Sequence, residues 1–290
     1  MGRCPGISDD DEPEITPPEP HEIFERTREE GKRRLERSRL ELVSTALVAG
    51  FDVVFGVLAL ITIAAAFSKP LGEEPAHALG ALGFGIAFIF IVVGRSELFT
   101  ENFLVPITGL ARGHITKLKL AELWLISPVF NIAGGTLLIA VASVHGVLPH
   151  GSAETVGKIA EGFDDNSAWT AFCSAIVGGA LITAMTWLVE GVGSIGGRIV
   201  CAWIAGVLLT LGSLNHVIVV TLEMIWGLFV GADIGGADVV QNFFVAAAGN
   251  MVGGIMFVTL TRTGQAVGAN DGDGPVEDDG DDGDDPEKKP

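Results

Sequence analysis

Long apolar segments alternate with short polar ones along most of the chain, from Leu42 to Thr261. A helix that crosses a bilayer needs about 20 consecutive, mostly apolar residues. Six segments meet this requirement: residues 42–67, 77–111, 121–147, 169–190, 198–231 and 239–262. The pattern predicts an all-α membrane protein with six transmembrane helices.

The second and fifth of these segments are too long and too interrupted to be plain helices. Residues 94–97, Gly-Arg-Ser-Glu, interrupt the second, and residues 212–216, Gly-Ser-Leu-Asn-His, interrupt the fifth. Non-helical backbone at membrane depth is tolerated only where protein buries it or where it lines a wet cavity. A pair of interrupted helices in corresponding halves of a chain indicates a transport site.

The two halves of the chain also share a motif. An N-x-x-G-G sequence begins at Asn131 and recurs 119 residues later at Asn250. The same offset pairs Glu97 in the first break with His216 in the second. Each half holds three spans, an odd number, so the pattern predicts an inverted 3+3 repeat. Chance recurrence of a small-residue packing motif is the alternative.

The basic residues indicate how the spans are oriented. They cluster before the first span, between the second and third, after the fourth and at the end of the sixth. The positive-inside rule places such loops in the cytoplasm. We therefore expect a multi-pass protein of the cell (plasma) membrane with both termini cytoplasmic. Residues 21–40 carry seven basic residues among apolar ones, which predicts an amphipathic interfacial helix on membrane lipid.

The two ends of the chain differ from the apolar segments because they carry most of the net negative charge. The formal net charge is −18, and acidic residues crowd into residues 1–20 and 264–290. Such blocks cannot bury enough apolar surface to offset the entropy of ordering, so both tails are predicted to be disordered. Residues 41–263 form the predicted six-helix transport domain. The acidic surface favours a halophilic source, where salt screens self-repulsion, and an acidic interaction tail is the alternative.

Three motifs together resemble those of a known family. Residues 94–102, G-R-S-E-L-F-T-E-N, resemble the E-L-F-T-x-N signature of formate/nitrite transporters, which a glycine precedes. His216 in the second break and the G-N-x-x-G-G segment at residues 249–254 are similar to that family's pore histidine and last-helix motif. The resemblance is that of a divergent, haloarchaeal-type member. It implies an aquaporin-like fold and a homopentamer with one pore in each protomer.

The resemblance also implies roles for individual residues. Thr100 matches the threonine that hydrogen-bonds the central histidine, His216 matches that histidine, and Asn250 matches an asparagine on the anion path. The remaining residues of the predicted substrate pathway lie in the two breaks or directly after the first: Asn215, Glu97, Leu98 and Phe99. Hydrophobic constrictions are expected at Phe84, Phe88 and Leu209.

Departures from the family pattern bear on the substrate. Asn215 stands where an acidic residue usually precedes the histidine. A lysine and an asparagine usually found in the fourth helix are missing, and Asp164 and Asp165 lie near the expected position of the lysine. An acidic entrance repels anions unless high salt screens its charge.

A formate or nitrite ion needs partners, because burying it unpaired in a low-dielectric core is prohibitive. The broken helices offer positive dipole ends, and His216 offers an imidazole, the side chain that changes charge near neutral pH. The chain is therefore predicted to be a channel or transporter for small monovalent weak-acid anions (formate, nitrite or hydrosulfide) or their protonated acids. Thr100 would hold the imidazole and Asn250 would offer its amide to the ion, with proton coupling left open.

Two other functions stay open at this point: a neutral small-solute pore and a non-conducting membrane scaffold. The spans show no paired carboxylates, metal cluster or nucleophile–base spacing, so no enzyme is expected. No cofactor, metal or nucleic-acid partner is predicted. Glu97 is expected to form a clamp with Arg95 on the first break, and Asp52 and Glu223 are expected to be packing or subunit-interface groups.

Overall fold

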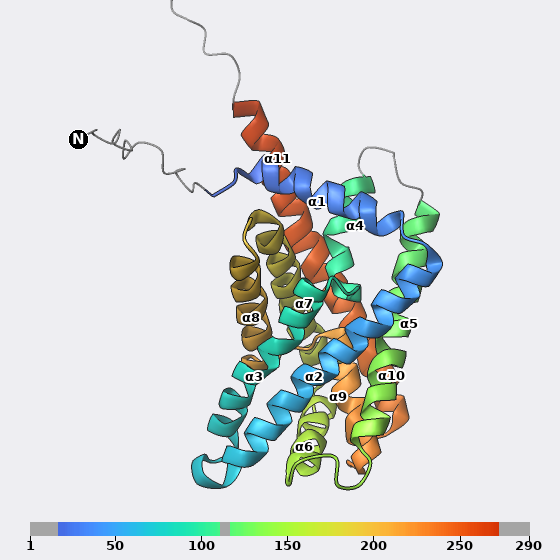
Figure 1. Ribbon diagram of the computed structural model, residues 1–290, viewed down its shortest axis with the longest axis vertical. Helices are drawn as coiled ribbons and strands as arrows, with labels where there is room; N and C mark the ends of the chain where they lie inside the picture. Colours follow the sequence, from blue (N-terminus) through green and yellow to red (C-terminus); the bar gives the residue numbers. More distant parts are fainter. Residues whose placement is uncertain (1–16, 111–116, 273–290) are drawn as a thin grey trace, which may run out of the picture.

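The computed structural model describes residues 17–110 and 117–272 of the chain as a bundle of helices (Figure 1). The helices are α1 (Pro20–Leu35), α2 (Arg39–Leu71), α3 (Glu73–Gly94), α4 (Val105–Leu110), α5 (Lys117–Ala142), α6 (Ser152–Asp164), α7 (Ala168–Gly191), α8 (Ile195–Leu211), α9 (Val217–Val230), α10 (Gly236–Met251) and α11 (Leu260–Gly272). A 3-10 segment, η1 (Phe99–Phe103), precedes α4, and a π-helical segment, η2 (Val252–Thr259), joins α10 to α11. Most of the two predicted acidic tails lies outside the described residues.

Five helical stretches are long and apolar enough to cross a membrane. They are α2, α3, α5, α7 and the continuous helix Gly236–Gly268, which consists of α10, η2 and part of α11. Helices α8 and α9 are also apolar but have only 17 and 14 residues. The prediction of an all-helical, multi-pass membrane protein is confirmed.

Both predicted breaks are present, and they share one backbone geometry. Arg95 follows α3 with a left-handed φ of 57°, and Ser213 follows α8 with a φ of 44°. The N–H of the next residue, Ser96 or Leu214, donates to the carbonyl five residues earlier, over 3.1 and 3.0 Å respectively. Such a left-handed residue ends a helix and satisfies one of its last carbonyls. Equivalent positions in the two breaks therefore lie 118 residues apart.

The 119-residue offset that links the two N-x-x-G-G motifs thus pairs the wrong residues in the breaks. Glu97 corresponds to Asn215, and Leu98 corresponds to His216. The predicted correspondence of Glu97 with His216 is therefore wrong by one residue. The chain between break and motif differs in length by one residue in the two halves, and no sequence signal marks that difference.

The glycines of the N-x-x-G-G motifs allow helices to approach to backbone contact. A Cβ atom added to Gly134 would lie 2.2 Å from the carbonyl oxygen of Leu47 in α2, and one added to Gly253 would lie 1.9 Å from that of Ile176 in α7. Any side chain would push these helices apart, since packed membrane helices depend on small residues at such crossings. The motif therefore sets the spacing of α5 to α2 and of η2 to α7.

Three segments differ from the prediction. Residues 148–168, expected to be a loop, contain α6, which buries Val156 and Ala160 against the bundle. The interfacial helix expected over residues 21–40 ends early, because Ser38 caps α2 by accepting a hydrogen bond from the N–H of Glu41. Residues 264–272, placed in the disordered tail, continue α11.

The two ends of the bundle are different in character. Helices α1 and α11 lie at one end, and the α2–α3 turn and α6 lie at the other (Figure 1). The chain therefore enters and leaves the bundle at the same end.

Candidate functional site

Two cavities open at the opposite ends of the bundle. The α6 cavity, of about 1000 Å³, is lined by the α2–α3 turn, by α6 and by residues of the second break. The α1 cavity, of about 640 Å³, lies between α1 and the first break. Equivalent residues line the two: Ile91 and Ser96 face the α1 cavity, and Leu209 and Leu214 face the α6 cavity.

A closed layer lies between the two cavities. Phe84, Phe88 and His216 are fully buried, and none of them lines either cavity. The ring of Phe88 stands edge-on to its neighbours, with centroids 6.0 Å from Phe84 and 6.3 Å from His216. Of the three predicted constriction residues, Phe88 packs beside the histidine and Phe84 packs against Phe88, whereas Leu209 lines the α6 cavity.

Both ring nitrogens of His216 are engaged. His216 is the N-cap of α9, and its Nδ1 accepts a hydrogen bond from the N–H of Val219 at 3.3 Å. Its Nε2 lies 2.7 Å from Oγ1 of Thr100 in η1. Because Nδ1 accepts, the proton of a neutral ring sits on Nε2 and is donated to Thr100. The hydroxyl of Thr100 can then give its own proton to another acceptor.

The first break is held in place by Asn131 of α5. Its Oδ1 accepts a hydrogen bond from the N–H of Phe99 at 3.0 Å, and its Nδ2 donates to the carbonyl oxygens of Ala46 and Glu97, both at 2.8 Å. The side chain therefore satisfies backbone groups that the interruption of the helix leaves without partners.

The second break is held by Asn250 in the same way. Its Oδ1 accepts from the N–H of Val217 at 2.9 Å, and its Nδ2 donates to the carbonyl oxygens of Ala175 and Asn215 at 2.7 and 2.9 Å. Both N–H groups of the amide are used, so none is left to donate to an ion. The geometry therefore does not fit the hypothesis that Asn250 offers its amide to the ion. It gives Asn250 a positioning role instead.

The other predicted pathway residues at the two breaks also make hydrogen bonds within the protein or are buried in its core. The Nδ2 group of Asn215 donates to Oδ1 of Asn242 at 2.8 Å, and its own N–H donates to Oγ of Ser174 at 3.0 Å. Leu98 is fully buried, and the ring of Phe99 is almost so. None of Asn215, Leu98 and Phe99 lines either cavity.

The buried carboxylate of Glu97 forms ion pairs with two arginines from the α1 end of the chain. Arg34 lies 3.4 Å away, and Arg37 is in direct contact. The side chain of Arg95 is 65% exposed and pairs with Glu30 instead, at 3.5 Å. The predicted clamp between Glu97 and Arg95 is therefore wrong. A desolvated carboxylate needs buried partners, and α1, which covers the break, supplies Arg34.

The same arginine network lines the α1 cavity. Arg34 also contacts Glu30 and Glu101, both at 3.0 Å. Burial by itself raises the pKa of Glu30, but the hydrogen bonds and charges of Arg33 and Arg34 outweigh this effect and lower the pKa to about 2. Glu30 is therefore charged at neutral pH, and the α1 cavity is lined by paired charges of both signs.

Two further carboxyl groups lie within the bundle. Asp52 of α2 accepts a hydrogen bond from Oγ of Ser96 at 2.7 Å, which ties α2 to the first break and agrees with a packing role. Glu223 of α9 is 3% exposed and lines the α6 cavity. It has no hydrogen-bond or ion-pair partner among the described residues. The expected packing or interface role of Glu223 does not fit a side chain that faces a cavity.

Sequence reasoning missed four residues that support this site: Asn131, Asn242, Arg34 and Arg37. Only Asn131 had a signal, since the motif that marks Asn250 also contains Asn131. The arginines looked like interchangeable members of a basic helix, and their burial depends on how α1 packs.

Comparison with known families identifies the kind of protein to which this site belongs. A family model described as formate/nitrite transporter matches residues 21–263. The chain belongs to the formate/nitrite transporter family. Formate/nitrite transporters are transport proteins and not enzymes, which agrees with the multi-pass helical fold.

Individual relatives are similar over most of the chain. The inner membrane protein YfdC of Escherichia coli (strain K12) is 26% identical over 247 residues, which cover 84% of this chain and 77% of that protein. A solved FNT family ion channel superposes with a TM-score of 0.74 at 17% identity, covering 82% of this chain and 96% of the other. A pentameric formate channel with formate bound superposes with a TM-score of 0.60 at 18% identity, covering 80% and 96%. At these identities the two structures show a likeness of fold.

Proposed function

We propose that this protein is a membrane channel or transporter for small monovalent weak-acid anions such as formate, nitrite or hydrosulfide, or for their protonated acids. The observation that carries the proposal is the hydrogen-bonded pair of His216 and Thr100 in the closed layer between two cavities from opposite ends. Membership of the formate/nitrite transporter family supports the substrate class.

The closed layer gives this pair its role. A bare anion cannot pass Phe84 and Phe88, because an unpaired charge in an apolar layer is prohibitively costly. The Nε2–H group of His216 and the hydroxyl of Thr100 are polar groups within that layer. The ion therefore crosses while it is hydrogen-bonded to, or protonated by, this pair.

We also propose that α8 and α9 together make a sixth crossing, so that the chain is an inverted 3+3 repeat with an aquaporin-like arrangement. Two observations support this topology: Asn131 and Asn250 hold equivalent breaks, and equivalent residues line cavities at opposite ends. The arginine-rich α1 supports cytoplasmic termini, with α1 on anionic lipid.

Two further proposals concern the assembly and the source of the protein. We propose a homopentamer with one pore in each protomer, supported by the likeness to the pentameric formate channel. We propose a halophilic, haloarchaeal-type source, supported by the net charge of −18. Salt would also screen the acidic α6 cavity.

Flux measurements on His216→Ala test the proposal. The purified protein is placed in liposomes at high salt, and uptake of formate and nitrite is followed from about pH 5 to about pH 8, the range in which histidine changes charge. We expect uptake that depends on pH in the wild type and falls to the level of protein-free liposomes in His216→Ala. The exposed His145 provides the matched control, His145→Ala, which should retain wild-type uptake.

Absence of uptake by folded wild-type protein would contradict the proposal and favour a membrane scaffold. A neutral small-solute pore is the second candidate, because the α6 cavity carries Glu73, Glu74, Glu154 and Glu223 against Lys69 and Lys158. Uptake of an uncharged solute that does not vary with pH, without uptake of formate, would establish that candidate instead.

A further inference from the structure

Glu223 is the one carboxyl group in the described residues of α9, and it lines the α6 cavity. It follows His216 by two helical turns, and Val219 lies between them on the same face of the helix. Val219 and Glu223 both line the α6 cavity, and the N–H of Val219 donates to Nδ1 of His216. A solute that moves along this face from the cavity meets Glu223 before His216.

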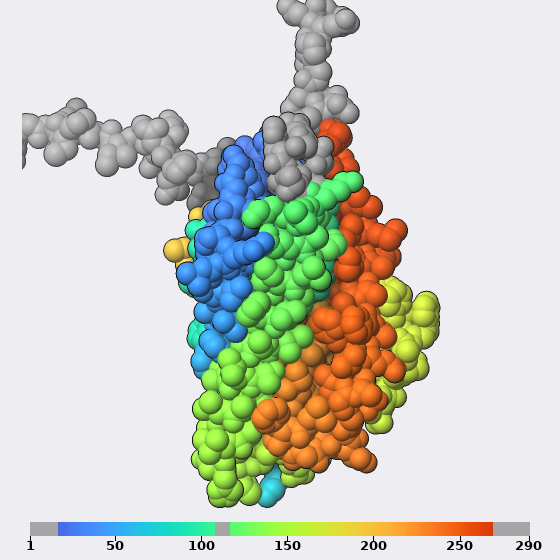
Figure 2. All heavy atoms as spheres, turned by 90° about the vertical axis from the view of Figure 1, so that its right-hand side faces the viewer, coloured from blue at the N-terminus to red at the C-terminus, as the bar shows by residue number. Residues whose placement is uncertain are grey.

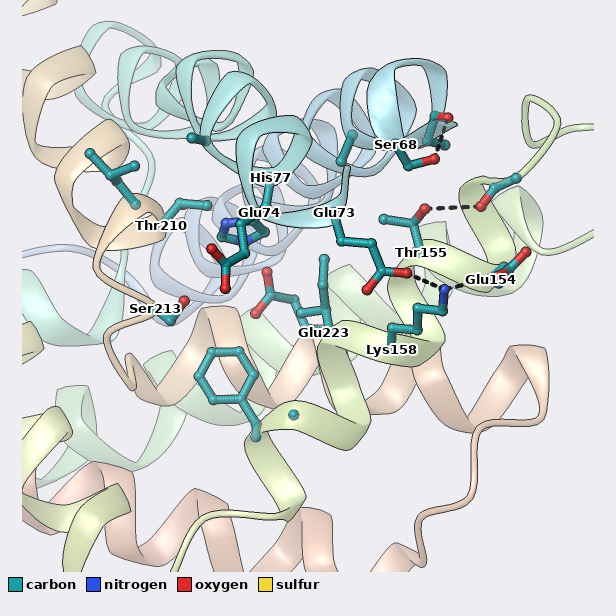
Figure 3. Close-up of a pocket in the computed structure, with 18 of the residues that line it drawn as sticks. Ser68, Glu73, Glu74, His77, Glu154, Thr155, Lys158, Thr210, Ser213 and Glu223 are labelled. Carbon is teal, nitrogen blue, oxygen red and sulfur yellow. Dashed lines mark hydrogen bonds and ion pairs between the residues drawn. The ribbon is translucent and has the colours of Figure 1, made fainter. Parts of the chain in front are cut away.

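The side chain of Glu223 is aimed into the cavity without a partner. It is 3% exposed, and it makes no hydrogen bond or ion pair with any described residue. Figure 3 shows Glu223 pointing toward His77 and Glu74 of α3. A carboxylate at this depth is costly unless it takes up a proton or pairs with a cation.

The surroundings favour a proton over a cation. The other charged and titratable groups that line the cavity are Lys69 from α2, Glu73, Glu74 and His77 from α3, His150 before α6, and Glu154 and Lys158 from α6. The lining residues of α8 and of the second break carry no charge. Lys158 is already paired with Glu73 and with Glu154, at 2.6 and 3.0 Å. No group of three or more His, Cys, Asp and Glu side chains in the described parts of the chain is placed to hold a metal ion.

We propose that Glu223 is the proton-exchange residue of the α6 cavity, where an incoming weak-acid anion receives the proton with which it crosses the closed layer. This inference rests on the proposed transport of weak-acid anions. In the exchange, the O–H bond of the Glu223 carboxyl group breaks, and an O–H bond forms on formate or nitrite (an S–H bond on hydrosulfide). The resulting carboxylate takes up a new proton from the solution in the cavity, with Glu74 and His77, toward which it points, as relay groups.

The substitution Glu223→Gln tests this role, because glutamine keeps the shape and can hydrogen-bond but cannot give up a proton. Formate uptake and proton uptake are measured together in liposomes. We expect the wild type to take up one proton with each anion, and Glu223→Gln to lose about 10²-fold in uptake near neutral pH, as is typical when an acid–base group is removed. The loss should shrink as the outside is acidified, because the solute then arrives already protonated.

The matched control is Asp233→Asn, at an exposed carboxyl group that follows α9 and lines neither cavity. It should leave uptake and its pH profile unchanged. Uptake by Glu223→Gln with the wild-type pH profile would overturn the inference while leaving the proposed function intact. A defect in Glu223→Gln that is equal at all pH values would also overturn it, because it would indicate a merely structural role.

Infrared spectroscopy gives a reading that does not depend on flux. The carboxyl C=O band that is present in the wild type and absent in Glu223→Gln should titrate with pH and shift when formate is added. A carboxyl band whose frequency does not change when formate is added would overturn the inference, even if the wild type transports no solute at all.

Discussion

His216 illustrates how one residue can serve both the fold and the site. As an N-cap it satisfies a free N–H at the start of α9, and through its other nitrogen it reaches Thr100 in η1. The helix cap fixes which nitrogen carries the proton, so the backbone determines the tautomer that faces Thr100. The motifs predicted both residues and their contact, but the capping role could not be foreseen because it depends on where α9 begins.

Removal of the Thr100 hydroxyl should damage both stability and transport. Thr100→Val keeps the shape but leaves the Nε2–H group of His216 buried without an acceptor, which costs about 1–3 kcal/mol. If the cost falls on the crossing step, uptake drops by about 10- to 100-fold. Thr100→Ser retains the hydroxyl and should keep most of the wild-type uptake. Equal uptake by the valine and serine variants would show that the contact is not used.

At the scale of helices, the sequence predicted where the two spans are interrupted. It did not predict helix α6 or the correct register between the two halves. The polar residues 94–97 and 212–216 marked both breaks, because polar groups stand out within apolar spans. Helix α6 was missed since its short amphipathic pattern lies in a polar region. The one-residue difference between the repeats was also invisible, because it became apparent only from the backbone hydrogen bonds at Ser96 and Leu214.

The attachment of α1 to the first break should depend on Glu97 and not on Arg95. Glu97→Gln leaves the charges of Arg34 and Arg37 without their central partner, and breaking a buried ion pair costs up to about 3–5 kcal/mol. The matched control is Arg95→Asn, which tolerates the left-handed backbone and removes an exposed pair worth about 0–1 kcal/mol.

Thermal unfolding of the two variants in detergent measures the difference. We expect a clear drop in melting temperature for Glu97→Gln and almost none for Arg95→Asn. A larger drop in melting temperature for Arg95→Asn would indicate that Arg95 is the main partner of Glu97 and would contradict the structure.

The whole molecule presents apolar side chains to its surroundings over long faces. Figure 2 shows α5 and the α10–η2 helix side by side on one such face. The exposed large apolar side chains of these two helices include Leu125, Val129 and Leu137 from α5 and Phe244 and Phe257 from α10–η2. Either lipid or neighbouring protomers must cover a surface of this kind.

In a pentamer, contacts between protomers would cover part of that apolar surface. The number of protomers can be measured directly. The chain has a mass of 30.3 kDa. Mass measurement of the protein released from mild detergent should therefore give five times the mass of the single chain. A stable monomer that still takes up formate would contradict the proposed assembly while leaving the pore within each protomer unaffected.

The closed layer between the cavities has an electrical consequence. Membrane voltage falls mainly where water does not reach, and in this protein that is the layer of Phe84, Phe88 and His216. One elementary charge that crosses 100 mV gains or loses about 2.3 kcal/mol. An anion that crosses the layer alone would therefore carry current that follows the voltage. An anion that crosses with a proton carries none, so its direction of travel would be set by the concentration gradients of the anion and the proton and not by the membrane potential.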